Sequence, residues 1–277
     1  MVHNGRWEIH SHSTVSDGRY TPNEVAELMA DHQVALWSLT DHDHVGGCKE
    51  AAQAASRLGI EFIAGIEVSA ALNGESIHVL GYGVDTEVEQ LADYGDQMVA
   101  DRRQRMEKMV QRINDLGFEV TMDDVRKIAG GGNLGRPHLA RALLKRGHID
   151  NLQQAFDRWL ADDGPGYVPL ARPSVPEAVE MIRDAGGVVV LAHPGRYSEF
   201  SAHLQEWIDA GLWGLEVRHP SHSQADERRL IELADAHGLG KTASNDWHGN
   251  KPDSVSKLGE VVFPREWKEE FLEVVGY

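Results

Sequence analysis

Two histidines separated by one residue, His10 and His12, are the first side chains whose types and spacing suit chemistry. They follow a short apolar-flanked segment at residues 6–9 and precede a Ser16-Asp17-Gly18 turn. If that segment is a strand, alternate side chains point the same way, so the two imidazoles can bind one ion. The loop to Asp17 is long enough to fold back. Two imidazoles and a carboxylate together suit a borderline divalent metal.

Similar side chains follow other expected strands. Apolar runs at residues 35–39, 61–66, 187–192 and 241–244 each end in, or lead directly to, His, Asp or Glu. The third expected strand ends at Glu67, and an Asn-Gly turn after it predicts a hairpin with His78 on its return strand. In (β/α) barrels the chemistry lies at the carboxyl ends of the strands. The candidate metal ligands are therefore His10, His12, Asp17, His42, Glu67, His78, His193, Asp246 and His248.

This set holds more ligands than one ion needs, since a single catalytic zinc takes about three from the protein. We therefore expect two or three ions, with Glu67 bridging two of them. Imidazoles and carboxylates without thiolates suit manganese, iron or zinc. Clustered ions can ionise a water and hold the oxygens of a phosphoryl group. A hydroxide on the ions would then be the nucleophile, with Asp17, His42, Glu67 and His193 as the catalytic residues around it.

The elements that must position these residues alternate between short apolar strands and helices. Capping boxes at Thr21–Glu24 and Ser174–Glu177 mark two helix starts. This alternation predicts a parallel sheet in a closed or nearly closed barrel. Residues 87–163 show helical periodicity without a convincing strand. We expect two barrel segments, 1–86 and 164–277, separated by an all-helical insertion at 87–163.

Composition restricts the class of partner. The chain has 277 residues and a formal net charge of −17, which disfavours broad electrostatic capture of duplex nucleic acid. Its one cysteine, Cys48, excludes an internal disulfide. We find no membrane-spanning stretch and no signal-peptide core, so a cytoplasmic protein is expected. The sequence predicts neither an oligomeric state nor a base preference.

The motifs resemble the PHP family, named for its polymerase-associated and histidinol-phosphatase members. They are His10-Ser-His12 with Ser16-Asp17-Gly18, Thr40-Asp41-His42-Asp43, Gly65-Ile66-Glu67-Val68-Ser69, Ala192-His193-Pro194-Gly195 and Asp246-Trp247-His248. The resemblance implies a distorted (β/α)7 barrel with a trinuclear site. It implies that His10, His12, Glu67 and Asp246 hold one ion, that Glu67, His78 and His193 hold a second, and that Asp17, His42 and His248 hold the third.

Within that family, the insertion resembles the nucleoside 3′,5′-bisphosphate phosphatase branch, which includes relatives that trim RNA from the 5′ end. The resemblance implies loss of the 3′-phosphate from a nucleoside 3′,5′-bisphosphate, with the insertion as a lid whose cations hold the 5′-phosphate. The alternative within the branch is 5′-to-3′ exonuclease action on short 5′-phosphorylated RNA or DNA. A metal-dependent amidohydrolase and a non-enzymatic regulatory domain are the competing classes.

Basic side chains near the expected site are candidate phosphate ligands, because guanidinium groups suit bidentate phosphate binding. Arg102 and Arg105 share a helix face, and Arg136 opens another helix, where backbone N–H groups also favour an anion. The candidate substrate-binding residues are Arg102, Arg105, Arg136, His138, Arg196 and His222. The other histidines, including His44 and His219, are expected to be surface or structural residues.

Overall fold

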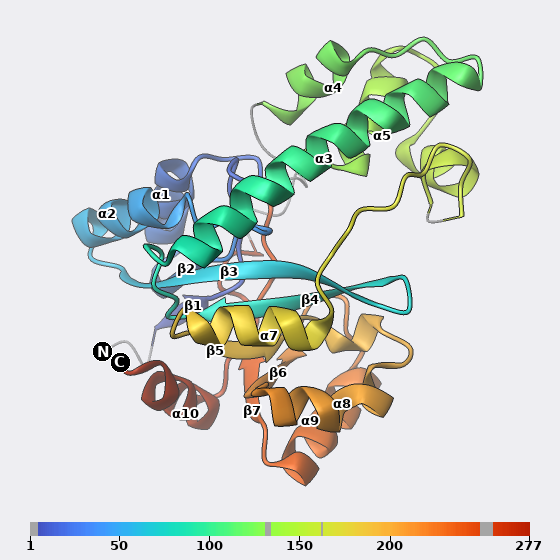
Figure 1. Cartoon of the computed structure of the whole chain (residues 1–277). Helices are drawn as coiled ribbons and strands as arrows, with labels where there is room; N and C mark the ends of the chain where they lie inside the picture. Colours follow the sequence, from blue (N-terminus) through green and yellow to red (C-terminus); the bar gives the residue numbers. More distant parts are fainter. Residues whose placement is uncertain (1–4, 131–133, 162, 250–256) are drawn as a thin grey trace.

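The protein is described by a computed structural model that covers residues 5–130, 134–161, 163–249 and 257–277. Parts of the predicted segments, at 1–4, 131–133, 162 and 250–256, lie outside the described residues. Seven strands form one sheet in chain order (Figure 1). They are β1 Arg6–Glu8, β2 Val34–Leu39, β3 Glu61–Leu72, β4 Glu75–Tyr82, β5 Val188–Leu191, β6 Gly214–Arg218 and β7 Gly240–Ala243.

Helices separate most of the strands, as the alternation predicts, and the last helix follows β7. The helices are α1 Pro22–Asp31, α2 Cys48–Leu58, α3 Glu89–Asp115, α4 Met122–Ala129, α5 Arg136–Lys145, α6 Leu152–Ala155, the π-helical turn η2 Phe156–Leu160, α7 Val175–Asp184, the 3₁₀ turn η3 Pro194–Arg196, α8 Phe200–Ala210, α9 Gln224–His237 and α10 Arg265–Val275. Both predicted capping boxes are present, at the starts of α1 and α7. No helix within the described ranges is long and apolar enough to cross a lipid bilayer.

The sheet departs from a regular parallel barrel at β4, which runs antiparallel to both β3 and β5. The remaining neighbours pair in parallel. The two outer strands approach each other just beyond their ends, where Ser11 and Trp247 form a parallel bridge. The amide of His12 donates to the Trp247 carbonyl at 2.8 Å, and the amide of Trp247 donates to the His10 carbonyl at 3.0 Å. The segments that carry His10, His12 and Asp246 are therefore tied together by backbone hydrogen bonds.

The prediction that a strand ends at Glu67 is wrong. β3 runs unbroken for 12 residues, and Glu67 lies in its middle. Pairing with β2 ends near Ala64, but pairing with β4 continues to the hairpin turn. The prediction divided this strand in two because Glu67, a charged residue, interrupts an apolar run. The structure buries Glu67 completely and leaves the strand intact. The Asn73-Gly74 hairpin turn is as predicted.

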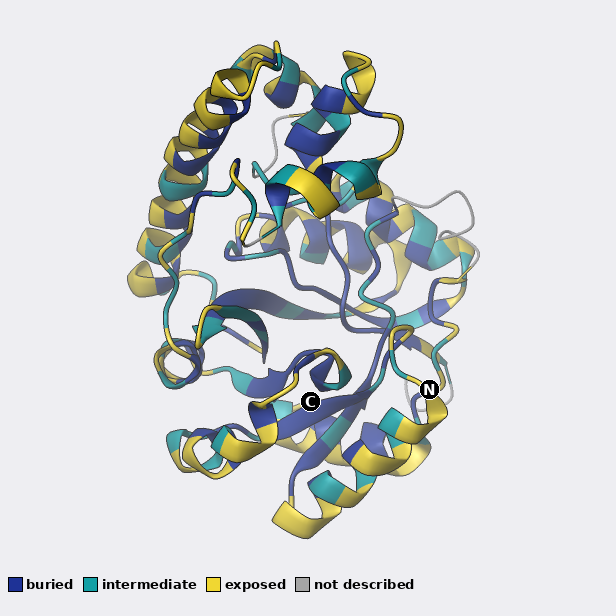
Figure 2. Ribbon diagram, turned by 90° about the vertical axis from the view of Figure 1, so that its right-hand side faces the viewer, coloured by how far each residue is buried: buried dark blue, intermediate teal, exposed yellow. Residues whose placement is uncertain are grey.

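The helical insertion has an apolar core of its own, separate from the cores of the barrel. Its members come from α3, α4, α5, α6, η2 and the segment after them, for example Met106, Val125, Leu143 and Leu160. Figure 2 shows α3 with a buried stripe facing inward and an exposed stripe facing solvent. This one helix extends from the barrel to the insertion core (Figure 1).

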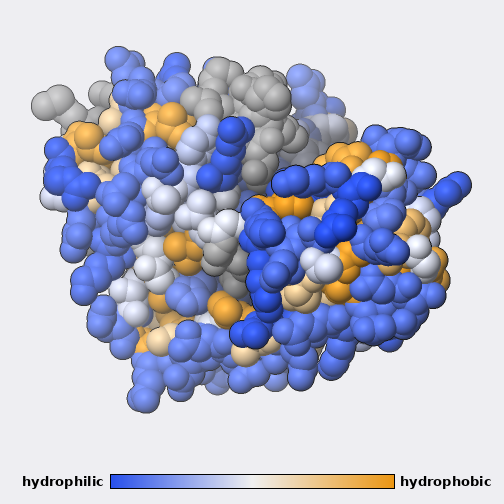
Figure 3. Space-filling model, turned by 90° about the horizontal axis from the view of Figure 1, so that it is seen from above, coloured by the Kyte–Doolittle hydropathy of each residue, from blue (hydrophilic) through white to orange (hydrophobic). Residues whose placement is uncertain are grey.

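Close contact between α3 and the barrel depends on Gly95. A Cβ atom at this position would lie 3.0 Å from the His44 ring and 3.2 Å from the Asp43 carbonyl oxygen. Glycine therefore lets the helix approach the segment that follows β2. Seen from above, the surface is mostly hydrophilic and its apolar patches are small and separate (Figure 3). That surface agrees with the formal charge of −17.

Candidate active site

The nine predicted ligand side chains lie close together near the carboxyl ends of the parallel strands. His10 and His12 directly follow β1, His42 follows β2, and His193 follows β5. Glu67 and His78 reach the same place from inside the β3–β4 hairpin. The remaining three come from the loop after β1 and the segment after β7; they are Asp17, Asp246 and His248. The convergence predicted from the sequence is present.

The first group of candidate ligands is His10, His12, Glu67 and Asp246, whose ligand atoms lie within 4.8 Å of one another. Nε2 of His10 lies 3.3 Å from Oε1 of Glu67 and 3.3 Å from Oδ1 of Asp246. Nε2 of His12 lies 3.2 Å from Oε2 of Glu67 and 3.0 Å from the same Asp246 oxygen. Two imidazoles and two carboxylates thus face one point. This is the same set of four that the family resemblance implies for one ion.

The second group contains Asp17, His42 and His248, joined by His12. Oδ1 of Asp17 lies 3.1 Å from Nε2 of His248 and 4.0 Å from Nε2 of His42. The His12 and His248 rings stack with centroids 4.0 Å apart. His12 therefore lies between the first and second groups, a position that the sequence does not reveal.

The third group is His42, Glu67 and His78. Glu67 places Oε2 2.9 Å from Nδ1 of His42 and Oε1 2.9 Å from Nδ1 of His78. His193, expected in this group, points Nε2 at Oε1 of Glu67 from 3.3 Å, while its Nδ1 lies 3.1 Å from the Tyr197 hydroxyl. Glu67 is common to the first and third groups. It has the central position that a bridging carboxylate requires.

The residues fit divalent metal ions. Nε2 of His10 and Oε2 of Glu67 are fully buried, and their close contacts with other candidate ligands do not form hydrogen bonds within the described part of the chain. Buried polar atoms without partners are costly unless a ligand satisfies them. The donors are imidazole nitrogens and carboxylate oxygens, the ligand set preferred by manganese, iron and zinc when thiolates are absent. The chemistry of the donors and the buried unpartnered atoms both point to cations.

The charge balance of the cluster shifts the pKa values of its members. Burial alone would raise the pKa of Glu67, but His42, His10 and His78 lower it well below its usual range. Burial likewise opposes the shift at Asp17, where His248 and His42 nevertheless lower the pKa well below its usual range. These carboxylates are therefore ionised at neutral pH, as metal binding requires.

The pKa values of two imidazoles, those of His248 and His193, shift in opposite directions. Burial would lower the pKa of His248, but the carboxylates of Asp17 and Asp246 raise it to about 10. Burial dominates at His193 and lowers its pKa to about 4. His193 is therefore neutral at pH 7, which leaves one ring nitrogen with a lone pair.

Backbone strain also concentrates here. Five described residues other than glycine have positive φ, and three of them are at the site: Asp43 at 58°, His193 at 32° and Asp246 at 51°. Such conformations cost energy and persist where surrounding contacts hold them. Two of the three are candidate ligands, so the strain lies in the turns that aim ligand side chains inward.

Sequence reasoning missed several buried supporting residues: Glu216 and His219 lie outside every motif, and Asp41 lies within one but was not assigned a role. Asp41 accepts from the Ser13 amide at 2.7 Å and from the Ser16 hydroxyl at 2.6 Å, which fixes the loop that carries Asp17. His219, expected to be surface or structural, is 7% exposed, and its Nε2 lies 3.6 Å from Oδ2 of Asp246. Glu216 contacts both His10 and the backbone of His193.

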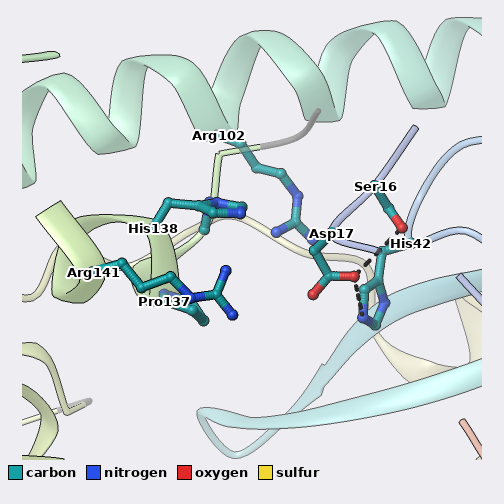
Figure 4. Close-up of a pocket in the computed structure, with 8 residues that line it drawn as sticks. Ser16, Asp17, His42, Arg102, Pro137, His138 and Arg141 are labelled. Atoms are coloured by element: carbon teal, nitrogen blue, oxygen red, sulfur yellow. Dashed lines mark hydrogen bonds and ion pairs between the residues drawn. The ribbon is translucent and has the colours of Figure 1, made fainter. Parts of the chain in front are cut away.

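A cleft lined by arginines opens beside the donor cluster. Its larger part has a volume of about 390 Å³ and includes Asp17, His42, His78 and His193 among its lining residues. The arginines that line its two adjoining parts are Arg102, Arg105, Arg136, Arg141, Arg172 and Arg196. In Figure 4, Arg102 extends from α3 while His138 and Arg141 extend from α5, all toward Asp17 and His42. Positive charge is thus concentrated at one place in an acidic chain.

The arginines are not equivalent. Arg102 forms a buried ion pair with Asp43 and donates to the Ser69 hydroxyl at 3.2 Å, so its charge is largely compensated. Arg105 donates Nε to the Val168 carbonyl at 2.6 Å, while its buried Nη2 has no hydrogen-bond partner among the described residues. Burial and the nearby Arg136 lower the pKa of Arg105 to about 10. An uncompensated, buried guanidinium beside the cleft favours an anionic ligand.

Arg172, which sequence reasoning missed, resembles Arg105. Its Nε is buried without a hydrogen-bond partner in the described ranges, and burial together with Arg102 lowers its pKa. It lies in the irregular segment between the insertion and α7, where no periodicity marks it. The guanidinium groups of Arg105 and Arg136 each lie 5.3 Å from the Tyr167 ring centroid. Tyr167 therefore helps to hold two cations at the cleft.

The other predicted substrate residues fall into two groups. Arg136, Arg196 and His138 line the cleft. His222 has both ring nitrogens engaged with backbone groups: Nε2 accepts from the Gly195 amide at 3.1 Å, and Nδ1 donates to the Val217 carbonyl at 2.8 Å. In this position His222 braces the turn that carries His193.

Comparison with known proteins adds the family relationship. The PHP domain model matches residues 8–162, more than half of the chain. A 3′,5′-nucleoside bisphosphate phosphatase of Chromobacterium violaceum is 35% identical over 246 residues, covering 87% of this chain and 86% of the relative. The 5′-3′ exoribonuclease Rnm of Escherichia coli is 29% identical, covering 87% and 85%. A phosphoribosyl 1,2-cyclic phosphate 1,2-diphosphodiesterase of Eggerthella lenta is 31% identical, covering 87% and 94%.

Solved structures agree along nearly the whole chain. A protein described as a metal-dependent phosphoesterase from Bifidobacterium adolescentis superposes with a TM-score of 0.85 and 32% identity, covering 97% of this chain and 96% of the other. A Chromobacterium violaceum protein described as an amidohydrolase, with bound sulfate and no metal, has the same TM-score and identity, covering 95% and 96%. These names differ in substrate while the fold is shared.

Proposed function

We propose that this chain, which belongs to the PHP domain family, hydrolyses the 3′-phosphate of nucleoside 3′,5′-bisphosphates. The products would be a 5′-mononucleotide and phosphate; 3′-phosphoadenosine 5′-phosphate is one such substrate. The observation that carries the proposal is the position of the arginine-lined cleft directly beside the imidazole–carboxylate cluster. The relative from Chromobacterium violaceum, named for this activity, supports it.

The residues that would hold the metal ions are the nine convergent side chains. His10, His12, Glu67 and Asp246 would hold one ion, and Asp17, His42 and His248 a second. Glu67 and His78 would hold a third, with His193 or His42 completing the group. We propose manganese, with iron or zinc as alternatives. Bound ions would supply Lewis-acid polarisation of the phosphoryl group and a lower pKa for bound water.

The chain's own residues would position the substrate. Arg105 and Arg172 would bind the 5′-phosphate, because each has a buried guanidinium nitrogen without a hydrogen-bond partner among the described residues, and Arg136 lines the same cleft. Arg102, held by Asp43, would present a fixed donor to the phosphoryl group near Asp17 and His42. Arg196 and His193 line the other side of the cleft. A phosphate fixed at one end places the second phosphate at the donor cluster, which lowers the entropic part of the barrier.

A 5′-to-3′ exonuclease acting on short 5′-phosphorylated oligonucleotides is the second candidate. It is favoured by the Escherichia coli relative and by a cleft that continues on both sides of Arg102 and His42. An amidohydrolase is the alternative of another class, and the name of one solved relative raises it. Six arginines around the cleft argue against a neutral amide substrate.

We further propose a cytoplasmic protein that binds a small phosphorylated substrate and no duplex DNA. The free thiol of Cys48 is buried, in keeping with a reducing compartment. The acidic surface repels a long polyanion, whereas the recessed arginines retain access for a nucleotide or short oligonucleotide.

The deciding experiment is a parallel assay of a nucleoside 3′,5′-bisphosphate, a 5′-phosphorylated trinucleotide, a nucleoside 5′-monophosphate and an amide substrate, with metal content measured on the same sample. We expect the bisphosphate to be hydrolysed far faster than the monophosphate, chelation to abolish the activity, and manganese to restore it. Equal rates on bisphosphate and monophosphate would remove the case for a 5′-phosphate pocket. Faster release of mononucleotides from the trinucleotide would favour the exonuclease, and cleavage of the amide alone would exclude both.

A further inference from the structure

β6 contributes none of the candidate ligands, yet its Glu216 is completely buried against two of them. Oε1 of Glu216 lies 2.9 Å from Nδ1 of His10. Oε2 of the same carboxylate accepts from the backbone amide of His193 at 2.8 Å. One side chain therefore links a residue that follows β1 to the turn that follows β5. Neither contact involves the cleft, because Glu216 is not among its lining residues.

We propose that Glu216 is a positioning residue that fixes the ring tautomer of His10 and the turn of His193, and thereby completes the metal site. This inference rests on the metal binding included in the proposed function. It assigns a role to a residue that no motif of the family resemblance includes.

The tautomer follows from hydrogen-bond chemistry. An ionised carboxylate only accepts hydrogen bonds, so the His10 nitrogen that faces it must carry the proton. That nitrogen is Nδ1, which leaves the lone pair on Nε2. Nε2 is the atom that faces Glu67 and Asp246, 3.3 Å from each. A carboxylate behind an imidazole orients the ring and makes the distal nitrogen a better ligand.

The second contact acts on the backbone. His193 has φ 32° and ψ 53°, in the left-handed region that a non-glycine residue occupies at a cost. Its amide is buried, and Glu216 satisfies it. Losing this acceptor would leave a buried donor unpaired and release the constraint on the turn. The His193 side chain would then lose its fixed aim at Glu67.

Glutamine cannot replace Glu216 in both contacts. If the amide oxygen accepts from His193, the amide nitrogen faces His10 and donates to Nδ1, so the His10 proton moves to Nε2. If the amide is flipped, its nitrogen faces the His193 N–H, and two donors oppose each other. Either arrangement removes one of the two functions. Glu8 offers a contrast: it is also fully buried, but among the described residues it accepts from Ser244, Asn245 and the Gly259 amide, none of which is a candidate ligand.

The test compares wild type, E216Q and E8Q by zinc and manganese titration and by ¹⁵N-histidine NMR of the zinc-loaded protein, with zinc chosen because it is diamagnetic. The His10 signals are assigned with H10N. In wild type, we expect a proton on Nδ1 of His10 and Nε2 coordinated. In E216Q, we expect metal affinity to fall roughly 10- to 100-fold and the Nδ1–H signal to be lost. E8Q should keep the His10 signals of wild type even if it unfolds at a lower temperature.

Each outcome decides something. A wild-type His10 with its proton on Nε2 overturns the inference by itself, whether or not any variant folds. An E216Q protein with wild-type affinity and an intact Nδ1–H signal overturns it as well. If E216Q does not fold, E216D keeps the charge but is too short to span both donors, and it should weaken zinc binding in the same direction. A wild type that binds no metal would refute the proposed metal site. Metal binding without hydrolysis of any phosphorylated substrate would refute only the proposed activity.

Discussion

Asp43 and Arg102 form a buried ion pair that joins the segment after β2 to the middle of α3. Asp43 also accepts from the Tyr94 hydroxyl at 2.8 Å and from the Ser69 amide at 2.6 Å. Tyr94 and Arg102 both belong to α3, so a single carboxylate holds this helix at two places. The helix that enters the insertion is thereby fixed to the barrel beside His42.

Replacing Asp43 with Asn should destabilise the protein by about 3–5 kcal/mol, because it leaves the Arg102 charge buried without its partner. Urea unfolding measures this, and the double variant D43N/R102M should recover part of the loss. D96N is the control, since the Asp96 side chain is 86% exposed. If D43N is as stable as D96N, the Asp43–Arg102 ion pair contributes nothing to the free energy of unfolding.

The same pair should respond to acid. Burial would raise the pKa of Asp43, but Arg102 and His42 lower it below the usual 3.8. The stabilisation is therefore complete above pH 3.8 and is lost as the pH falls through the folded-state value. The difference in unfolding free energy between wild type and D43N/R102M should shrink below pH 4. A difference that stays constant to pH 2 would contradict this.

Replacing Glu67 with Gln should remove at least one equivalent of bound metal and lower hydrolysis by at least about 100-fold. Mutating a residue that only hydrogen-bonds to a metal ligand already lowers metal affinity or activity roughly 10- to 100-fold. Glu67 itself belongs to two ligand groups, so its loss should have a larger effect. Elemental analysis and initial rates measure both effects. Circular dichroism checks that the fold survives, and E61Q on the same strand is the control, because Glu61 is exposed. Full metal content in E67Q would exclude a bridging role.

Replacing Arg105 or Arg172 with Met should raise KM for a nucleoside 3′,5′-bisphosphate roughly 10- to 100-fold, since a hydrogen bond to a charged group contributes about 1.5–3 kcal/mol. The KM for p-nitrophenyl phosphate, which has no second phosphate, should not change. R103M is the matched control on the same helix, because the Arg103 side chain is 65% exposed. Equal effects on both substrates would place these arginines at the reacting phosphate instead.

Without metal, His248 and His193 should make the stability of the protein depend on pH in opposite directions. The pKa of His248 rises from 6.5 to about 10 on folding, so its stabilisation is complete below pH 6.5 and is lost as the pH approaches 10. The pKa of His193 falls from 6.5 to about 4, so its contribution is present above pH 6.5 and is lost as the pH falls toward 4. Thermal unfolding in a chelator buffer series measures both limbs. H248N should reduce the loss of stability on the alkaline limb, and an unchanged alkaline limb would refute the assignment.

The sequence could predict most of the barrel, because its strands and helices have local signals. The capping boxes at Thr21 and Ser174 predict two helix starts, and the Asn73-Gly74 turn predicts the hairpin. The candidate ligands could be found because motifs place them close to strand ends. Glu67 was misplaced at a strand end because a buried charge in the middle of a strand violates the apolar pattern on which the prediction rests.

Residues that act through long-range contacts could not be predicted. Glu216 lies 206 positions from His10 in the chain, and nothing near it in the sequence marks it as different from any strand glutamate. Arg172 lies in a segment without secondary structure, and His219 follows β6 without a motif. Their roles depend on which strands become neighbours, which is a property of the folded sheet and not of any short stretch of sequence.

The length of α3 limits how the enzyme can open. A helix of 27 residues is a stiff rod about 40 Å long. One part of it is clamped to the barrel by Asp43, and another lies in the insertion core with Met106 and Ile113. The chain returning from the insertion is also tied down, since the Ala71 amide donates to the Pro173 carbonyl at 2.9 Å. Because the insertion is attached to the barrel both through α3 and through the returning chain, we expect the proposed nucleotide substrate to enter and leave through the side of the cleft, without a hinged movement of the insertion.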